Sequence, residues 1–456
     1  MRIRWLAALL GGLWVGCGGS GPTHVVVISI DSLRADHLGS YGYDRATSPN
    51  IDRLASDGTL FEQAQSSTTW TLPAHAALFT GLVGSLHGVL DHAHSLSKDL
   101  PTLAERFAAA GWATGAVVSG PYLHPRYGLA RGFDDYLNCM SFLDEAFQAK
   151  GIGELNRASH GDENGACVLR RATQWLSDHR DGPAFLFVHF WDVHFDYAPP
   201  VPWEKRFDPN YVGDMNGRNF LRNPAIRRKM DPRDLEHLIA LYDGEIGYTD
   251  VLVGRLLDQL DAQGIGSSTL VVLTSDHGDA FFEHGVKGHQ QDLHVEALRI
   301  PLLFRGPGVP RGVRRPGPAS IIDVAPTLLE LTGLEAPGPP AVGRGVSLVE
   351  AMRDPTVLDD RWVFAELRCC GHWDTAVVGR DTKIVRDRLT DSLQVYDLKQ
   401  DPGERRPRAP TVEESGRING TLWGLKRHAP NFPAAEKIGP PAAELGEQLR
   451  ALGYAE

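Results

Sequence analysis

A threonine and a histidine lie four residues apart in the stretch TTWTLPAHAALFTG, residues 68–81. The Thr71 hydroxyl can act as a nucleophile, and the His75 imidazole lies close to it along the chain. Pro73 suits the first turn of a helix, and a helix N-terminus favours a bound anion. A helix cap is the plainer role for Thr71, and the two roles are compatible. This stretch alone leaves open which hydroxyl, if any, is a nucleophile.

Acidic and imidazole residues follow three apolar runs. These residues are Asp31 after VVVISI, Asp192 and His194 after FLFVHFW, and Asp276 and His277 after VVLTS. In open α/β sheets, ligands bind beyond the carboxyl ends of the strands. One such aspartate is more often a cap, but three endings in one sheet favour a divalent-cation site. Because a cation lowers the pKa of a bound hydroxyl, Thr71 would be expected among its ligands if it is the nucleophile.

The elements that must position these residues alternate between apolar runs and helical patterns from residue 24 to about 330. This alternation predicts an α/β fold, a doubly wound and mostly parallel sheet with helices on both faces, over residues 23–340. After a Pro/Gly-rich turn, residues 345–400 read as a small antiparallel lobe. Residues 401–440 are rich in Pro and Arg and are expected to be irregular, and residues 442–454 form a terminal helix. Residues 345–456 are thus predicted to be a C-terminal subdomain.

The N-terminus has the features of an export signal. Arg2 and Arg4 precede an apolar run, residues 5–15, that is too short to span a bilayer stably. Cys17 directly follows this region, as in a bacterial lipoprotein, although Trp14 departs from the usual pattern. Residues 1–17 are therefore predicted to be a signal peptide, with a lipid anchor at Cys17 as the membrane attachment. Simple cleavage and a retained anchor are the alternatives, and the expected location is the periplasm, outer membrane or cell surface.

Charge and cysteine content narrow the classes of partner. The chain has 456 residues, with 46 basic and 57 acidic side chains and a net charge of −11. Because no block of like charge stands out, a nucleic-acid partner is not expected. Four cysteines remain besides Cys17, at 139, 167, 369 and 370. In so long a chain, these four cysteines predict one disulfide or none. No sequence feature indicates an oligomeric state.

Seven motifs in order resemble sulfatases of the alkaline phosphatase superfamily. They are ISIDSLRADHLGSYGY, SPNIDRLASDGTLFEQAQSS, PAHAALFTGL, FVHFWDVHFDYAPP, YDGEIGYTDVLVGRLLDQL, TSDHGDAFFEHG and VYDLKQDPGE, between about residues 24 and 405. The resemblance implies a metal-binding α/β domain with a smaller C-terminal subdomain. By position it implies that Asp31, Asp276 and His277 are metal ligands. Ser32 replaces a second acid that such enzymes often carry.

The resemblance also implies roles for two further histidines. His194 lies where such enzymes place a histidine against the anionic ester, and His289 lies near a substrate-binding lysine. Both would then be catalytic or would contact substrate oxygens. Alternatively, Asp192, Asp196 (or His194) and His289 would hold a second metal ion. One ion is favoured over two. The oxygen ligands suit calcium or magnesium, and the imidazoles suit zinc or manganese.

The segment around Thr71 departs from the sulfatase pattern. Sulfatases have Cys or Ser, then x-Pro-x-Arg, and the first residue is oxidised to formylglycine. Here Thr71 and His75 occupy the two diagnostic positions. A threonine cannot form the aldehyde hydrate that releases sulfate. The stretch instead resembles the nucleotide pyrophosphatase/phosphodiesterase branch, which uses threonine and carries a later His-Gly pair, here His87-Gly88.

The predicted function is therefore that of an exported, metal-dependent hydrolase of an anionic ester, with Thr71 as covalent nucleophile. A phosphate or phosphodiester is favoured over a sulfate. A sulfate-ester hydrolase that works without formylglycine is the main alternative. A transferase that passes a phosphoryl-linked group to a lipid or glycan, and a binding protein without turnover, also remain open.

Overall fold

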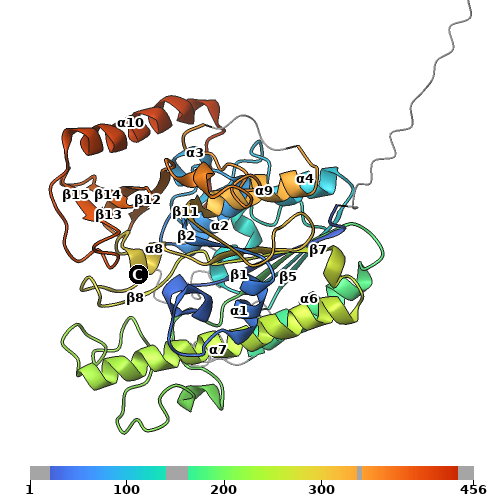
Figure 1. Ribbon diagram of the computed structural model, residues 1–456, viewed down its shortest axis with the longest axis horizontal. Helices are drawn as coiled ribbons and strands as arrows, with labels where there is room; N and C mark the ends of the chain where they lie inside the picture. The colour runs from blue at the N-terminus through green and yellow to red at the C-terminus, as the bar shows by residue number, and fades with distance from the viewer. Residues whose placement is uncertain (1–20, 140–162, 336–340, 440–456) are drawn as a thin grey trace, which may run out of the picture.

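A computed structural model describes residues 21–139, 163–335 and 341–439 and places a mixed, mostly parallel sheet of eight strands at the centre of the molecule (Figure 1). The strands follow the order β11-β2-β10-β7-β1-β6-β4-β5, and β10 alone runs antiparallel to its neighbours. Their bounds are β1 His24–Ile30, β2 Thr59–Gln65, β4 Ala113–Val118, β5 Asp135–Asn138, β6 Ala184–Phe190, β7 Thr269–Thr274, β10 Leu302–Arg305 and β11 Val313–Ser320. This sheet matches the predicted fold class.

Both faces of the sheet are covered, as the continuous apolar runs predict. Every residue of β1 is buried. Val25 and Val27 belong to one hydrophobic core, whereas Val26 and Ile28 belong to the core on the opposite face. Successive side chains of a strand point to opposite faces, so an unbroken apolar strand needs a layer of helices on each side.

The helices form these two layers (Figure 1). The layer on one face contains α1 Pro49–Ser56, α6 Glu163–Asp178 and α7 Pro232–Ala262. The layer on the other face contains α2 Thr71–Thr80, α4 Leu103–Ala109 and α9 Val324–Leu331. The short elements are α3 Gly84–His87, α8 Val295–Leu298, and the two-residue strands β3 His94–Ser95, β8 Ala280–Phe281, β9 Lys287–Gly288 and β16 Glu436–Lys437. No helix in the described ranges is both long and apolar enough to cross a membrane.

The C-terminal subdomain contains the predicted antiparallel sheet, of four strands. The strands are β12 Val363–Cys369, β13 His372–Val378, β14 Thr382–Asp387 and β15 Leu393–Asp397. The expectation of an irregular 401–440 segment is wrong over α10, Val412–His428. A capping box starts this helix, with Thr411 and Glu414 each bonding the other's backbone N–H. The predicted signal peptide, Cys17 and terminal helix lie outside the described residues.

Two disulfides are present where the sequence predicted one or none. Cys139, just after β5, is bonded to Cys167 of α6, with the two Cα atoms 5.8 Å apart. Cys369 is bonded to its neighbour Cys370. The first pair is 28 residues apart in the chain, and the fold brings its members within disulfide distance.

Candidate active site

The carboxyl ends of two adjacent parallel strands position the acidic residues of the site. Asp31 follows β1, and Asp276 and His277 follow β7, which pairs with β1. Thr71 is the first residue of α2, in the helix layer above this edge. All four side chains are at most 1% exposed. Parallel pairing therefore brings together residues that are more than 200 positions apart in sequence.

The Thr71 hydroxyl lies against the imidazole of His277. His277 Nε2 is 3.2 Å from Thr71 Oγ1 and 3.4 Å from Asp276 Oδ2. The same nitrogen is 3.9 Å from Asp31 Oδ1. Asp31, Thr71, Asp276 and His277 were all predicted as metal ligands, and the structure gathers them around one point.

A histidine that the sequence analysis missed joins this group. His189 lies within the buried strand β6, and its Nδ1 donates to the Ser119 carbonyl at 2.7 Å. Its Nε2 is 3.4 Å from Asp31 Oδ2. The sequence did carry a signal for His189, because it is a histidine inside an otherwise apolar strand. A fully buried polar group needs a hydrogen-bond partner or a ligand.

The carboxylate oxygens and imidazole nitrogens that meet here are suited to bind a cation. Among the described residues, Asp31 Oδ2, Asp276 Oδ2 and His189 Nε2 are buried and have no hydrogen-bond partner. His277 Nδ1 donates to the Gly278 carbonyl at 3.0 Å, so its Nε2, like that of His189, presents a lone pair. Two carboxylates and two lone pairs facing one another repel unless a cation lies between them.

Burial and charge shift the pKa values of these groups. Burial lowers the pKa of His189 to about 4, which keeps the imidazole neutral and able to bind a metal. Burial, and next the nearby Asp276 carboxylate, raise the pKa of Asp31 well above its usual range. Two carboxylates that share one buried site cannot both ionise easily without a counter-charge.

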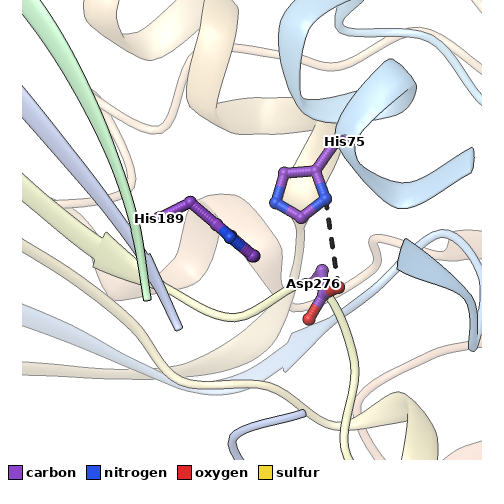
Figure 2. A group of neighbouring side chains, drawn as sticks. All are labelled: His75, His189 and Asp276. Carbon is purple, nitrogen blue, oxygen red and sulfur yellow. Dashed lines mark ion pairs between the residues drawn. The ribbon is translucent and has the colours of Figure 1, made fainter. Parts of the chain in front are cut away.

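His75 contacts the backbone of Thr71. Its Nδ1 donates to the Thr71 carbonyl at 2.8 Å, and its Nε2 is 3.1 Å from Ser29 Oγ. Figure 2 shows its ring beside His189 and Asp276, with Nδ1 3.9 Å from Asp276 Oδ2. Burial, and then the neighbouring His189 ring, lower the pKa of His75 to about 3. His75 is therefore neutral and does not supply the positive charge of the arginine that it replaces.

A second group of ligand-type atoms lies next to the first. His277, Asp279 and His289 place one atom each within 4.8 Å of one another. Asp279 Oδ1 is 2.6 Å from His289 Nδ1, and Asp279 Oδ2 accepts from the Tyr197 hydroxyl at 2.6 Å. The His289 ring centre is 4.2 Å from that of His277. Asp279 was not predicted, although it follows Asp276 by three residues.

His194 borders the same side of the site. Its ring stacks on the Trp191 indole at 3.9 Å and lies 5.2 Å from the His289 ring centre. It is 1% exposed and follows β6, as the sequence analysis expected. The two predicted substrate-contact histidines are thus neighbours.

The residues suggested for a second metal ion are not assembled in this way. Asp192 Oδ1 accepts from the Gly165 N–H at the start of α6, at 3.1 Å. Asp196 accepts backbone N–H groups of Asn219 and Phe220. Within the described part of the chain, no group of three close metal-type ligand atoms includes either aspartate. His289 pairs with Asp279 instead.

Comparison with known proteins gives the family. The sulfatase family model matches residues 23–334. A relative named ulvan-active sulfatase, from Formosa agariphila, is 26% identical over 358 residues, which cover 74% of this chain and 66% of that protein.

Solved structures share the fold. A phosphonate monoester hydrolase of Agrobacterium radiobacter has a TM-score of 0.70 at 22% identity, covering 90% of this chain and 96% of its own. A protein solved with its substrate D-glucosamine-2-N,6-O-disulfate has a TM-score of 0.70 at 17% identity, covering 90% of this chain and 97% of its own. The chain belongs to the sulfatase family of hydrolases.

Proposed function

We propose that the chain is a metal-dependent hydrolase that cleaves an anionic ester through a covalent Thr71 intermediate, and that a phosphate, phosphodiester or phosphonate ester is its substrate. The observation that carries this proposal is the Thr71 hydroxyl 3.2 Å from His277 Nε2, at the edge of a buried carboxylate pair. A free alcohol is a weak nucleophile at neutral pH, so this surrounding is what would activate it.

The donor set supports one divalent cation. Asp31, Asp276, His277 and His189 would hold it, with Thr71 as the neighbouring oxygen. Two carboxylates balance a charge of +2, and two imidazoles favour zinc or manganese over calcium or magnesium. When bound, such an ion would lower the pKa of the Thr71 hydroxyl and offset charge on the ester oxygens.

The residues of the chain suggest the order of bond changes. Thr71 Oγ1 loses its proton to solvent and attacks phosphorus, an Oγ1–P bond forms, and the bond to the leaving oxygen breaks. The leaving oxygen takes up a proton. Water then displaces Thr71 Oγ1, and the acid product leaves. His75 would hold the Thr71 backbone in place through its 2.8 Å bond to the carbonyl.

His289 and His194 are proposed to serve the substrate. The Asp279 carboxylate, 2.6 Å from His289 Nδ1, orients the ring. A histidine held in this way would bind ester oxygens or give the proton to the leaving group. His194, whose ring centre is 5.2 Å from that of His289, would supply a second contact from the same side of the site.

The nature of the nucleophile favours phosphorus over sulfur. Threonine cannot form the aldehyde hydrate that releases sulfate in sulfatases. A sulfate bound to Thr71 would therefore be released only if water attacked sulfur. A solved neighbour of the same fold is named phosphonate monoester hydrolase, which supports phosphorus as the reacting centre. Sulfate-ester hydrolysis is the second candidate, favoured by the relatives that are named sulfatases.

Export is also proposed. The basic start, apolar run and Cys17 support a signal peptide and a lipid anchor. Mass spectrometry of the mature protein would show a lipid on Cys17, whereas an unmodified Met1 would contradict this proposal.

The test of the proposed function is hydrolysis of four nitrophenyl esters: the sulfate, the phosphate, a phosphodiester and a phosphonate. The protein without its first 17 residues would be assayed with zinc, manganese and calcium, beside Thr71→Ala. We expect turnover of a phosphorus ester with zinc or manganese, and its loss by at least about a thousandfold in Thr71→Ala. Turnover of the sulfate that survives in Thr71→Ala would refute both the nucleophile and the substrate class.

A further inference from the structure

A cavity of about 420 Å³ lies away from the metal-type ligands, between α3, the four-stranded sheet and α10. These elements lie side by side at one end of the molecule (Figure 1). The walls include Arg368 of β12, Trp373 and Thr375 of β13, and Arg388 just after β14. Trp423 of α10 completes the rim. The cavity therefore belongs to the C-terminal subdomain.

Two arginines flank one tryptophan in this cavity. Arg368 is the cross-strand partner of Trp373, and the Arg388 N–H donates to the Trp373 carbonyl at 2.7 Å. The guanidinium carbons lie 4.9 Å and 5.1 Å from the indole centre. Stacking on an aromatic ring holds a guanidinium in place but leaves its N–H donors available.

The donors of these arginines are not used by the described residues. Neither guanidinium has an ion pair or a side-chain hydrogen bond within the described ranges, and both act on the Glu366 carboxyl only through their charge, which partly offsets the rise in its pKa that burial causes. Lys426 of α10 adds a third cation to the wall. The one carboxyl in the lining, Glu366, accepts from the Ser85 N–H and hydroxyl, and burial raises its pKa. The cavity thus presents positive charge.

A buried hydroxyl in the wall also lacks a partner. Thr375 is 2% exposed, and its Oγ1 has no hydrogen bond within the described ranges. Leaving a buried hydroxyl unpaired costs free energy, which a ligand hydroxyl would recover. Trp423 at the rim is 63% exposed, and an exposed indole packs well against the C–H face of a sugar.

A gap too small to admit a water molecule separates this cavity from the segment before Thr71. The gap shares Leu90, Glu366 and Arg368 with the cavity, and its other walls include Thr68 and Trp70. The Glu366 N–H also donates to the Ser67 carbonyl at 2.9 Å. The segment just before Thr71 therefore packs against Glu366 and Arg368, which line the cavity.

We propose that this cavity binds a second anionic group of an acidic oligosaccharide, with its carboxylate or sulfate on Arg368 and Arg388 and a sugar ring against Trp423. Planar guanidiniums match the oxygens of such groups in a bidentate way. The inference rests on the proposed function in one respect: the ester cleaved at Thr71 would belong to the same oligosaccharide.

Binding is measured first by calorimetry on the full chain carrying Thr71→Ala, so that turnover does not interfere. The probes are a chondroitin 4-sulfate hexasaccharide, neutral xylohexaose and a 12-nucleotide single-stranded DNA. We expect the sulfated hexasaccharide to bind and the Arg368→Ala/Arg388→Ala variant to bind it at least tenfold more weakly. Arg180→Ala, which removes an exposed arginine of the α/β domain, is the matched control and keeps full affinity.

Unchanged affinity in the double arginine variant, or equal binding of xylohexaose, would overturn the site. So would DNA binding that depends on the two arginines when the hexasaccharide does not bind. Nitrophenyl ester turnover by the wild-type chain separates this inference from the proposed function. A chain that binds the hexasaccharide through its arginines but cleaves none of the esters retains the site and refutes the proposed hydrolysis.

Discussion

His75 Nδ1 donates a hydrogen bond to the carbonyl oxygen of Thr71, 2.8 Å away and one helical turn earlier. The residue in the place of the sulfatase arginine therefore bonds to the backbone of Thr71, the proposed nucleophile. Its second nitrogen is occupied by Ser29 Oγ at 3.1 Å. We therefore propose that His75 is a positioning residue.

His75→Ala is expected to lower kcat by about tenfold or more and to destabilise the protein by about 1–3 kcal/mol, because it leaves buried polar groups unpaired. Cation affinity should change little. Thr80→Ala is the matched control, since it removes a similar side-chain bond to the backbone, Thr80 Oγ1 to the Ala76 carbonyl, at the far end of α2. A His75→Ala variant whose kcat matches that of Thr80→Ala would contradict the positioning role.

His189→Gln is expected to weaken zinc or manganese binding by at least about tenfold, because it removes a lone pair that faces Asp31 at 3.4 Å. Calorimetry on chelator-treated protein measures this affinity. His24→Gln is the control, since His24 is also a buried histidine of a central strand but lies at the start of β1. Equal affinities in the two variants would exclude His189 as a ligand.

Lys383→Met is expected to destabilise the protein by about 3–5 kcal/mol. Lys383 is 1% exposed and pairs with Glu404, whose carboxylate would remain buried without its partner. Urea denaturation measures the loss, and Lys383→Met/Glu404→Gln should recover part of it. Arg380→Ala breaks an exposed pair with Asp359 and should cost less than about 1 kcal/mol. If Lys383→Met and Arg380→Ala lost similar amounts of stability, the buried Lys383–Glu404 pair would not be the costly one to break.

The buried His87 is expected to make the free energy of unfolding depend on pH. Burial lowers its pKa to about 3, whereas an unfolded histidine titrates near 6.5. Between these values the unfolded chain takes up a proton and the folded chain does not. The free energy of unfolding should therefore fall by about 1.4 kcal/mol per pH unit from this residue as the pH drops from about 6.5 toward 3.

Urea denaturation of the wild type and His87→Gln at several pH values tests this dependence. The variant should lose stability less steeply in that window, because it lacks the titrating imidazole. Parallel slopes for the two proteins would show that His87 does not contribute.

The sequence alone predicted the α/β sheet, the antiparallel C-terminal sheet and the strand-end positions of Asp31, Asp276 and His277. These follow from local patterns, since apolar runs and helical spacing report burial and the ends of parallel strands meet at one edge. The start of α10 also had a local signal, the capping box of Thr411 and Glu414, but the surrounding Pro and Arg residues outweighed it.

Only the tertiary structure decided which polar side chains converge. His189 joins Asp31 because β6 pairs with β1, in a register that places Ser29 beside His189. Asp192 is directed to α6 and Asp196 to residues 219–220, although both lie within seven residues of His189. Sequence spacing does not specify strand register or side-chain direction, because contacts between distant segments determine both.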